Sequence, residues 1–379
     1  MSTLIPRELR GLRPPTITSP LRNVRVTARV GRVLGVAIAI CFVTGFISHL
    51  HQNPVSWLPI PPTPSWGYRL TQGLHVASGL ASIPLVLVKL FSVYPKLFAW
   101  PPARSLSQAL ERLSIAVLVS SMIFELTSGV ANIAQWYPFG FFFPRAHYAV
   151  AWAVVGSLLV HLAVKAPLIT AALRARLDLP HEQGLSRRGL LFATGAAVAT
   201  LTAVTVGQTL PGFGRLALLA PRRPDIGPQG LPVNKTATGA RVRESATAPD
   251  WALTVAGPTA LALSLKDLNA LPQFDYELPI ACVEGWSASA LWGGVRLADI
   301  LDRAGIDRAA SVRVTSLQQG GLYGSSVLTA AQARHDTTLL ALRVRGEVLA
   351  LDHGFPLRLI APNRPGVLQT KWLSRIEAI

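Results

Sequence analysis

The sequence has little charge and almost no cysteine. Only 15% of its 379 residues are charged, against about 25% in typical soluble domains. Half of the residues are hydrophobic, and the mean hydropathy is +0.39. This composition disfavours a wholly soluble protein and indicates a membrane protein. The two cysteines, Cys41 in an apolar run and Cys282 in a distant polar region, are not expected to pair, so each has to be interpreted separately.

Acidic residues are also scarce, since 19 Asp and Glu face 36 Lys and Arg and leave a net charge of +17. A basic excess often indicates nucleic-acid binding, but here the charge is localised. Arginines crowd the segment before the first apolar run, where Glu8 is the one acidic residue (Arg7, Arg10, Arg13, Arg22, Arg25, Arg29, Arg32). This pattern is typical of a cytoplasmic flank beside a membrane helix. We therefore expect no nucleic-acid partner.

Five apolar stretches approach the length of about 20 residues that spans a bilayer. They are Val33–Leu50, Leu74–Tyr94, Leu113–Ala134, Tyr148–Ile169 and Leu190–Leu210. The N-terminus and the connections Lys96–Arg112 and Arg174–Arg188 are basic. The connections Pro54–Tyr68 and Gln135–Pro144 are instead rich in aromatic residues and proline, and they carry no Lys or Arg. The positive-inside rule then predicts a multi-pass protein of the cytoplasmic membrane, with a cytoplasmic N-terminus and an extracytoplasmic tail after Leu210.

The expected organisation follows from these runs. It comprises a basic N-terminus (1–32), a four-helix membrane domain (33–170), a fifth helix (186–210), a linker rich in Pro, Gly and Arg (211–233) and a tail (234–379). Ser186-Arg187-Arg188 opens the fifth helix. The arginine pair suits either an ordinary cytoplasmic flank or an internal twin-arginine export signal, which would carry a folded, cofactor-loaded domain across the membrane.

The tail differs from the five apolar stretches in its sequence pattern. Short segments predict strands at Trp251–Val255, Val312–Thr315, Arg343–Val348 and Leu357–Ile360. Leu297–Ala304 predicts a short helix. The expected fold class is therefore an all-α transmembrane bundle of five helices followed by an α+β domain. At about 145 residues, that domain is large enough for its own core.

Cys282 stands in Ile-Ala-Cys-Val-Glu-Gly-Trp, between apolar residues and a carboxylate. Taken alone, it suits a buried structural cysteine, which behaves as a small hydrophobic residue. The functional alternatives are a catalytic thiolate and a soft metal ligand. No Ser/His/Asp arrangement and no CxxC spacing in the sequence competes for the chemistry.

The spaced blocks around it resemble the sulfite oxidase family, in the compact branch that includes the periplasmic methionine sulfoxide reductase catalytic subunit. They are Cys282-Val-Glu-Gly-Trp-Ser, Trp292-Gly-Gly-Val-Arg-Leu, His353-Gly-Phe-Pro-Leu-Arg358, Gly366 and Thr370-Lys371-Trp372. The resemblance covers the last ~145 residues in consistent order. The whole layout also resembles five-span actinobacterial membrane proteins expected to bind molybdenum.

This resemblance implies a molybdenum held by a pyranopterin dithiolene and one cysteine thiolate, which is Cys282 here. A soft thiolate is a suitable ligand for a redox-active metal. The resemblance also implies a set of residues that bind the molybdopterin: Asn234, Ser316 (or Thr315 if the alignment shifts by one), His353, Arg358, Gln369, Thr370 and Lys371. Arg358 would hold the phosphate with two parallel hydrogen bonds.

Glu284 follows the proposed ligand by two residues. If the segment is extended, both side chains face the same way, and Glu284 would be either a proton donor or a residue that orients the cysteine loop. Sulfite oxidases also present several arginines to their anionic substrate. Arg313, Arg345 and Arg364 are available here, but none can be placed, so sulfite is not assigned as the substrate.

Histidines in membrane segments are candidates for function. His49, His75 and His147 are expected near the outer face, where an outer b-type haem iron would bind two of them. His161 lies 14 residues after His147, about 21 Å deeper along a helix, a spacing that resembles stacked haems. It has no histidine partner at matching depth. The remaining three, His51, His181 and His335, are expected in loops.

The sequence thus predicts a membrane-anchored, molybdopterin-dependent oxidoreductase. It would carry out two-electron chemistry of the oxygen-atom transfer type on a small molecule outside the membrane. Its electrons would pass to or from quinone or a carrier. The alternative is a non-catalytic membrane protein whose tail keeps the fold but not the metal, and Cys282 argues against it.

Overall fold

The computed structural model describes residues 24–55, 57–98, 105–174, 187–209, 213–220, 222 and 226–379. Several predictions concern residues outside these ranges: the first arginines of the basic N-terminus, His181, Ser186, Leu210 and part of the linker 211–233. The predictions for the remaining residues are compared with the structure below.

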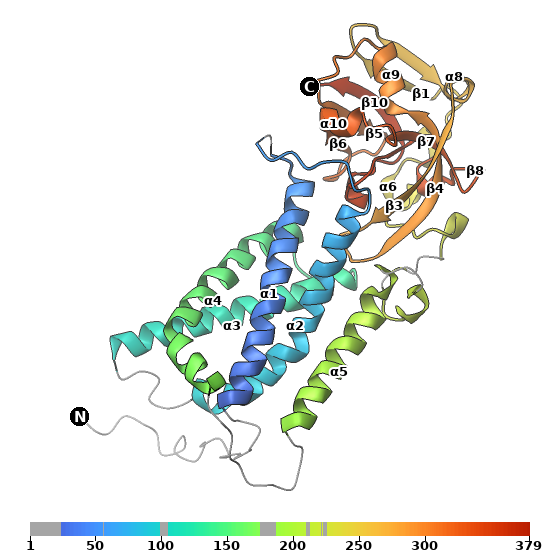
Figure 1. Ribbon diagram of the computed structural model, residues 1–379. Coiled ribbons are helices and arrows are strands. Elements are labelled where there is room, and N and C mark those ends of the chain that lie inside the picture. The colour runs from blue at the N-terminus through green and yellow to red at the C-terminus, as the bar shows by residue number, and fades with distance from the viewer. Residues whose placement is uncertain are drawn as a thin grey trace. The chain divides into compact units, whose positions relative to one another are not determined.

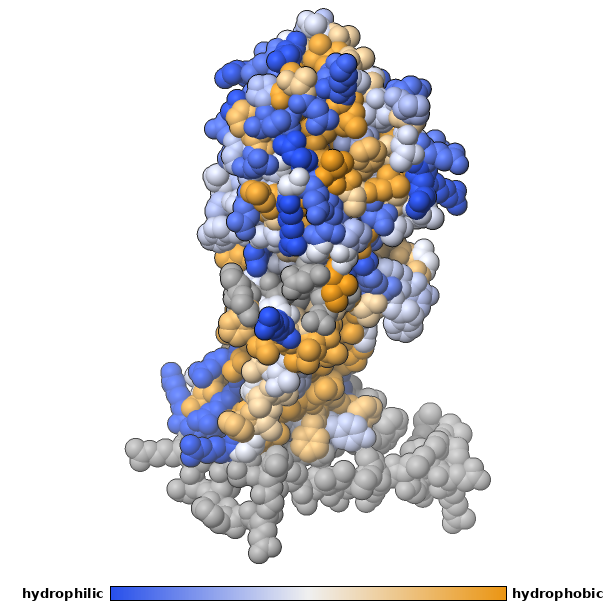
Figure 2. All heavy atoms as spheres, turned by 90° about the vertical axis from the view of Figure 1, so that its right-hand side faces the viewer, coloured by the Kyte–Doolittle hydropathy of each residue, from blue (hydrophilic) through white to orange (hydrophobic). Residues whose placement is uncertain are grey.

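Five helices among the described residues are long and apolar enough to cross a membrane, as the five apolar stretches predicted. They are α1 (Val24–Gln52), α2 (Gly67–Leu97), α3 (Leu106–Ile133), α4 (Phe143–Arg174) and α5 (Arg187–Val206). Their surfaces carry exposed aliphatic side chains such as Val36, Leu87 and Leu159. Figure 2 shows hydrophobic residues dominating the visible surface of these helices, whereas hydrophilic residues are frequent over the C-terminal domain.

The remainder of the chain is a mixed α and β domain, drawn from yellow to red in Figure 1. Its strands are β1 (Ala252–Ala256), β2 (Leu261–Ser264), β3 (Phe274–Ala281), β4 (Ser287–Arg296), β5 (Val312–Ser316), β6 (Ser325–Leu328), β7 (Leu339–Val344), β8 (Glu347–Val348), β9 (Arg358–Ile360) and β10 (Leu373–Ala378). Its helices are α6 (Ala237–Ala240), α7 (Arg243–Ala246), α8 (Leu265–Ala270), α9 (Leu297–Arg303) and α10 (Ala330–Ala333). The α+β class and the helix near Leu297 are confirmed.

The strands form two sheets. One has the order β2-β1-β10-β5-β6, and the other has the order β3-β4-β7-β8, with β9 also paired to β7. Strand β1 runs parallel to β10, whereas the other pairs are antiparallel. The antiparallel pair β3–β4 extends over eight residues of each strand and brings Ala281 opposite Ser287. The chain between these two residues therefore forms a tight connection, and it contains Cys282.

Alternating side chains explain why these segments form a core. Along β5, Val312 and Val314 are buried while Arg313 is exposed, and along β1 Leu253 and Val255 are buried on either side of Thr254. Successive strand residues point to opposite faces, so the first sheet has one apolar side, whereas β7 of the second sheet is buried on both faces. The main core joins residues of both sheets to α8 and α9, and a second core packs Cys282 and Trp286 against β3, β4 and β7.

The single strand predicted at Arg343–Val348 is wrong. β7 ends at Val344, and the chain reverses through Arg345 and Gly346 into β8. Both turn residues have positive φ, 53° at Arg345 and 82° at Gly346. Two consecutive left-handed residues suit the right-handed twist of a two-residue hairpin. Gly346 is the one residue in this segment that signals a turn. The alternating residues on either side of it therefore predicted a continuous strand.

The chain divides into two compact units. The first comprises Met1–Ala39, Gly79–Val130 and Gly140–Leu201, and the second comprises Ile40–Ser78, Ala131–Phe139 and Thr202–Ile379. The second unit thus includes the last part of α1, the connection that follows it, the first part of α2 and the end of α3. These helix ends belong to the same unit as the two sheets.

Candidate molybdopterin site

Cys282 begins the short connection from β3 to β4. Its backbone N–H donates to the carbonyl of Trp286 at 2.9 Å, and the Gly285 N–H donates to the carbonyl of Cys282 at 3.1 Å. Gly285 has φ of 92°, a conformation that glycine adopts without steric cost. The connection is therefore a closed turn, and the extended arrangement that would place Glu284 and Cys282 on one side is not formed.

Glu284 instead binds within its own turn. Its Oε2 accepts a hydrogen bond from the Trp286 indole at 2.8 Å and lies 3.6 Å from Nε of Arg222. Arg222 also donates to the side chain of Gln135 at 3.0 Å. The carboxylate thus ties the cysteine turn to neighbouring segments, which favours an orienting role for Glu284 over a proton donor.

The Cys282 side chain is buried, with 1% of its surface exposed. Burial raises the pKa of its thiol, and the nearby Glu284 carboxylate raises it further. Without a cation the thiol is therefore the stable form. A buried thiol can be either a structural cysteine or a metal ligand, because a bound metal ion supplies the positive charge that a thiolate needs.

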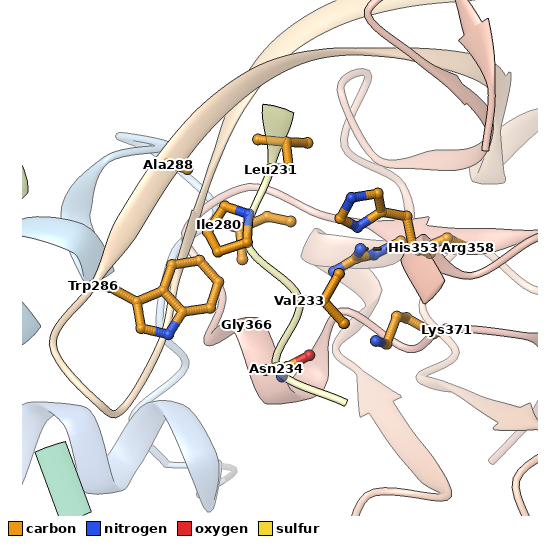
Figure 3. Close-up of a pocket in the computed structure, with 11 residues that line it drawn as sticks. Leu231, Val233, Asn234, Ile280, Trp286, Ala288, His353, Arg358, Gly366 and Lys371 are labelled. Atoms are coloured by element: carbon orange, nitrogen blue, oxygen red, sulfur yellow. Dashed lines mark hydrogen bonds between the residues drawn. The ribbon is translucent and has the colours of Figure 1, made fainter. Parts of the chain in front are cut away.

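A hollow lies beside this turn, and four predicted cofactor-binding residues line it (Figure 3). These four are Asn234, His353, Arg358 and Lys371. The other lining residues are Leu231, Pro232, Val233, Ile280, Trp286, Ala288 and Gly366. Figure 3 shows the segment of Val233 and Asn234 running between Trp286 on one side and the three basic residues on the other. The end of the predicted linker therefore forms part of the site.

Arg358 is a buried cation at this hollow, with 5% of its surface exposed. Its guanidinium lies over the ring of Trp292 at 5.1 Å, and Nη1 donates to the carbonyl of His353 at 3.0 Å. Its Nε has no hydrogen-bond partner among the described residues. Burial lowers the pKa of Arg358 to about 9. A buried cation with an unsatisfied donor is suited to hold an anion.

Lys371 and His353 stand beside it. The Lys371 ammonium donates to the backbone carbonyls of Lys235 and Asp352, and burial, with the charge of Arg358, lowers its pKa to about 6. Burial also lowers the pKa of His353 to about 4. Its Nε2 lies 2.7 Å from the carbonyl of Pro228, so Nε2 carries the proton, and Nδ1 of the neutral ring is an acceptor.

The other predicted site residues do not line the hollow, and Cys282 and Glu284 are among them. Ser316 donates to the carbonyl of Lys371 at 2.7 Å. Gln369 makes two hydrogen bonds with the backbone of Ala361, and Thr370 lies 2.7 Å from the hydroxyl of Ser326. Ser316, Gln369 and Thr370 thus support β9, which carries Arg358, and the segment before β10 that carries Lys371. Thr315, the alternative to Ser316, is also absent from the lining.

The three arginines that could not be placed from sequence also lie outside the hollow. Arg313 pairs with Glu377 at 3.3 Å, and Arg345 occupies the β7–β8 turn. Arg364 is buried and donates to Leu368 O and Gln332 Oε1. None of them forms an anion-binding cluster with Arg358 in the described structure, so the arginine set expected for sulfite is not assembled here.

The histidines predicted near a haem hold other polar groups. In the second unit, Nδ1 of His75 lies 2.8 Å from the carbonyl of Cys41, and Nδ1 of His49 lies 3.4 Å from the Asn53 amide. In the first unit, Nδ1 of His147 lies 3.0 Å from Glu125. The assignment of His51 to a loop is wrong, because His51 is buried within α1. His335 lies in a turn, as expected.

Sequence reasoning missed Arg222, Leu231 and Val233 because they belong to the linker and match no motif. Trp286 and Gly366 were within the quoted blocks without an assigned role. Their roles as lining residues come from the turn geometry, which sequence spacing does not give.

Comparisons with known proteins concern the same part of the chain. Residues 240–379 match the family described as oxidoreductase molybdopterin binding domain. A sulfite oxidase of Arabidopsis thaliana is 32% identical over 150 residues, covering 31% of this chain and 38% of that protein. The uncharacterized oxidoreductase YuiH of Bacillus subtilis is 34% identical over 130 residues, covering 34% of this chain and 64% of that protein.

A further relative is the putative protein-methionine-sulfoxide reductase subunit YedZ1 of Azospira oryzae. It is 34% identical over 115 residues, which cover 30% of this chain and 43% of that protein. The chain therefore spans less than two thirds of each of these relatives.

Proposed function

From the premise that residues 240–379 form a sulfite oxidase-like, molybdopterin-binding oxidoreductase domain, we propose that the chain is a membrane-anchored molybdenum oxidoreductase. It acts on a small molecule outside the cytoplasmic membrane, with two-electron chemistry of the oxygen-atom transfer type. The observation that carries the proposal is the buried cysteine turn beside a hollow lined by Arg358, Lys371 and His353.

The donor set fits the implied cofactor. Cys282 supplies the soft thiolate for molybdenum. Arg358 supplies positive charge for the phosphate of the pterin, and a phosphate beside Lys371 would raise the pKa of that amine and keep it protonated. No carboxylate among the described residues pairs with either side chain. Neutral His353 offers an acceptor at Nδ1 for a ring N–H. The bound cofactor supplies the two-electron redox chemistry.

The protein's own part is binding and exclusion of water. Trp286, Ile280 and Leu231 give the hollow an apolar wall. The hydrogen bonds of Ser316 and Gln369 hold the backbone from which Lys371 and Arg358 extend. Glu284 fixes the indole of Trp286 next to the cysteine turn. These contacts keep the donors in place before a cofactor binds, which reduces the cost of ordering them.

The electron partner is proposed to be quinone or a redox carrier. A b-type haem bound by two of His49, His75 and His147 would connect them. What supports this is that Nδ1 of His75 faces a backbone carbonyl and Nδ1 of His147 faces a carboxylate, the contacts by which proteins orient a metal-binding imidazole. A reduced-minus-oxidised spectrum tests it. A b-type band lost in His75→Ala supports the haem, and no band in the intact protein refutes it.

The test of the main proposal is metal and pterin analysis of the full chain, purified from a host that makes the cofactor. We expect stoichiometric molybdenum, and its loss in Cys282→Ala. Cys41→Ala is the matched control, since it removes the other cysteine, which lies within α1, and it should keep its metal. Protein without molybdenum from such a host would overturn the proposal and favour the non-catalytic alternative.

A further inference from the structure

The carbonyl of Val283, the residue after Cys282, receives two side-chain hydrogen bonds from the helical part of the chain. Nε2 of Gln72 on α2 donates to it at 3.0 Å, and Nδ2 of Asn132 near the end of α3 donates to it at 3.3 Å. All three residues belong to the second compact unit. Since a carbonyl oxygen has two lone pairs, these two donors satisfy it fully.

Both amides are themselves oriented by their neighbours. Oε1 of Gln72 accepts a hydrogen bond from the Ser48 hydroxyl at 2.8 Å, which leaves the Gln72 amino group directed at Val283. Oδ1 of Asn132 accepts from the Tyr137 hydroxyl at 3.0 Å. Gln72 and Asn132 are buried. Because an amide has a distinct acceptor and donor end, each network selects one orientation of the side chain.

The same turn is held at two further points. Gly285 is so close to α2 that an added Cβ would lie 3.0 Å from Val76, so the turn packs directly on that helix. At its start, Ala281 forms a bridge with Pro365. Asn363, two residues earlier, accepts from the Tyr68 N–H at 2.6 Å and donates to the Pro61 carbonyl at 2.7 Å.

We propose that Gln72 and Asn132 are positioning residues for Cys282, so that the helices set the geometry of the metal-ligand turn. This inference rests on the proposed function, in which Cys282 binds molybdenum. Two donors on one carbonyl fix the peptide plane between Val283 and Glu284 and thereby restrict the backbone of Cys282. Such outer contacts tune the affinity and the potential of a metal centre.

The test compares Gln72→Met, Asn132→Leu and the double variant, all in the full chain in detergent. Thr71→Val is the matched control, because within the described part of the chain its hydroxyl bonds only to carbonyls of its own helix. The first readout has two parts, the electron paramagnetic resonance spectrum of Mo(V) and the midpoint potential of the molybdenum centre. We expect both to shift in the double variant and to stay unchanged in the control, while molybdenum content per folded chain falls by less than half.

The second readout needs no cofactor. In cofactor-free protein with Cys41→Ala, a small maleimide reports how often the turn opens and exposes Cys282. Loss of one net hydrogen bond corresponds to a change of about fivefold in an opening equilibrium. We therefore expect labelling about fivefold faster in each single variant and faster still in the double variant.

The two readouts separate the possible failures. If the intact protein holds no molybdenum, the proposed function fails, and the labelling rates still decide whether the helices hold the turn. If the labelling rate, the spectrum and the potential of the double variant all equal those of Thr71→Val, the positioning role is refuted. Each single variant keeps one donor on the carbonyl, so the rates remain measurable even if the double variant does not fold.

Discussion

Arg358 is a guanidinium that the fold buries without a carboxylate partner among the described residues. It has one backbone acceptor, His353 O, and an aromatic face, Trp292, while its Nε is unsatisfied. Burying a charge without full compensation is costly. A residue that serves stability alone would be better replaced by an apolar side chain. The arrangement makes physical sense if an anion completes the coordination of the guanidinium.

Replacing this residue, as in Arg358→Met, should therefore separate stability from cofactor binding. Losing a charge-assisted hydrogen bond of about 1.5–3 kcal/mol weakens cofactor retention roughly 10- to 100-fold. The cofactor-free chain should melt at the same or a higher temperature, because a buried charge is removed. Molybdenum content and thermal unfolding measure the two effects. Arg313→Met, which breaks a surface pair, should change neither. A lower melting temperature with full molybdenum content would make Arg358 a purely structural residue.

At this scale the sequence motifs selected residues that the structure brings together. Asn234, His353, Arg358 and Lys371 line one hollow, although 119 to 137 residues separate the first from the others. The closed turn at Cys282 was not predicted, because a glycine with positive φ and two backbone hydrogen bonds leave no periodic pattern in the sequence. The orienting contact of Glu284 depends on that turn.

Among the elements, the β7–β8 hairpin is the clearest case in which local conformation overrides pattern. Arg345 adopts φ of 53°, where a residue with a Cβ costs roughly 1–2 kcal/mol. Its side chain is exposed. The second turn residue is Gly346, so the turn lacks only the asparagine that two-residue hairpins prefer at the first position.

We expect Arg345→Asn to raise the stability of the domain by about 0.5–1 kcal/mol, since asparagine tolerates the left-handed region. Thermal unfolding of the full chain in detergent measures it. Gly346→Ala should have the opposite sign, by about 1 kcal/mol, because alanine is strained at φ of 82°. Equal or reversed effects of the two variants would contradict the turn as described.

The helices were predicted well, because an apolar run of about 20 residues is long enough to span a bilayer and is rare in water-soluble domains. Their ends were less accurate. α1 begins at Val24 rather than at Val33, and the extra turns contain Arg25, Arg29 and Arg32. Long basic side chains can lie along an apolar surface while their charged ends reach water. Hydropathy alone therefore places the start of this helix too late in the sequence.

At the scale of the whole molecule, the division into compact units does not coincide with the division into membrane helices and C-terminal domain. The second compact unit joins the end of α1 and the start of α2 to both sheets. This joining depends on side chains such as Gln72 and Asn363, which pair with residues more than 200 positions away. Single polar residues in an apolar run carry no partner information, so sequence reasoning placed the boundary in the linker instead.

The proposed orientation of the chain rests on the distribution of its charges, and it leads to a prediction about which segments a protease can reach. With a cytoplasmic N-terminus, five crossings place Ile379 outside. An epitope tag after Ile379 should be digested by protease added to spheroplasts, while a tag inserted between Arg174 and Arg187 should be protected. The reverse pattern would refute the proposed location of the catalytic domain.

The role of the arginine pair can be decided in the same assay. Arg187→Lys with Arg188→Lys keeps both charges, so a flank that acts through the positive-inside rule leaves the tag at Ile379 accessible. A twin-arginine signal is read by a receptor, and a lysine ammonium does not reproduce the guanidinium geometry. In that case the tag becomes protected and molybdenum stays with the cytoplasmic side. We expect protection, because a domain that binds its cofactor between residues as distant in the sequence as Asn234 and Lys371 has to fold around it before it crosses the membrane.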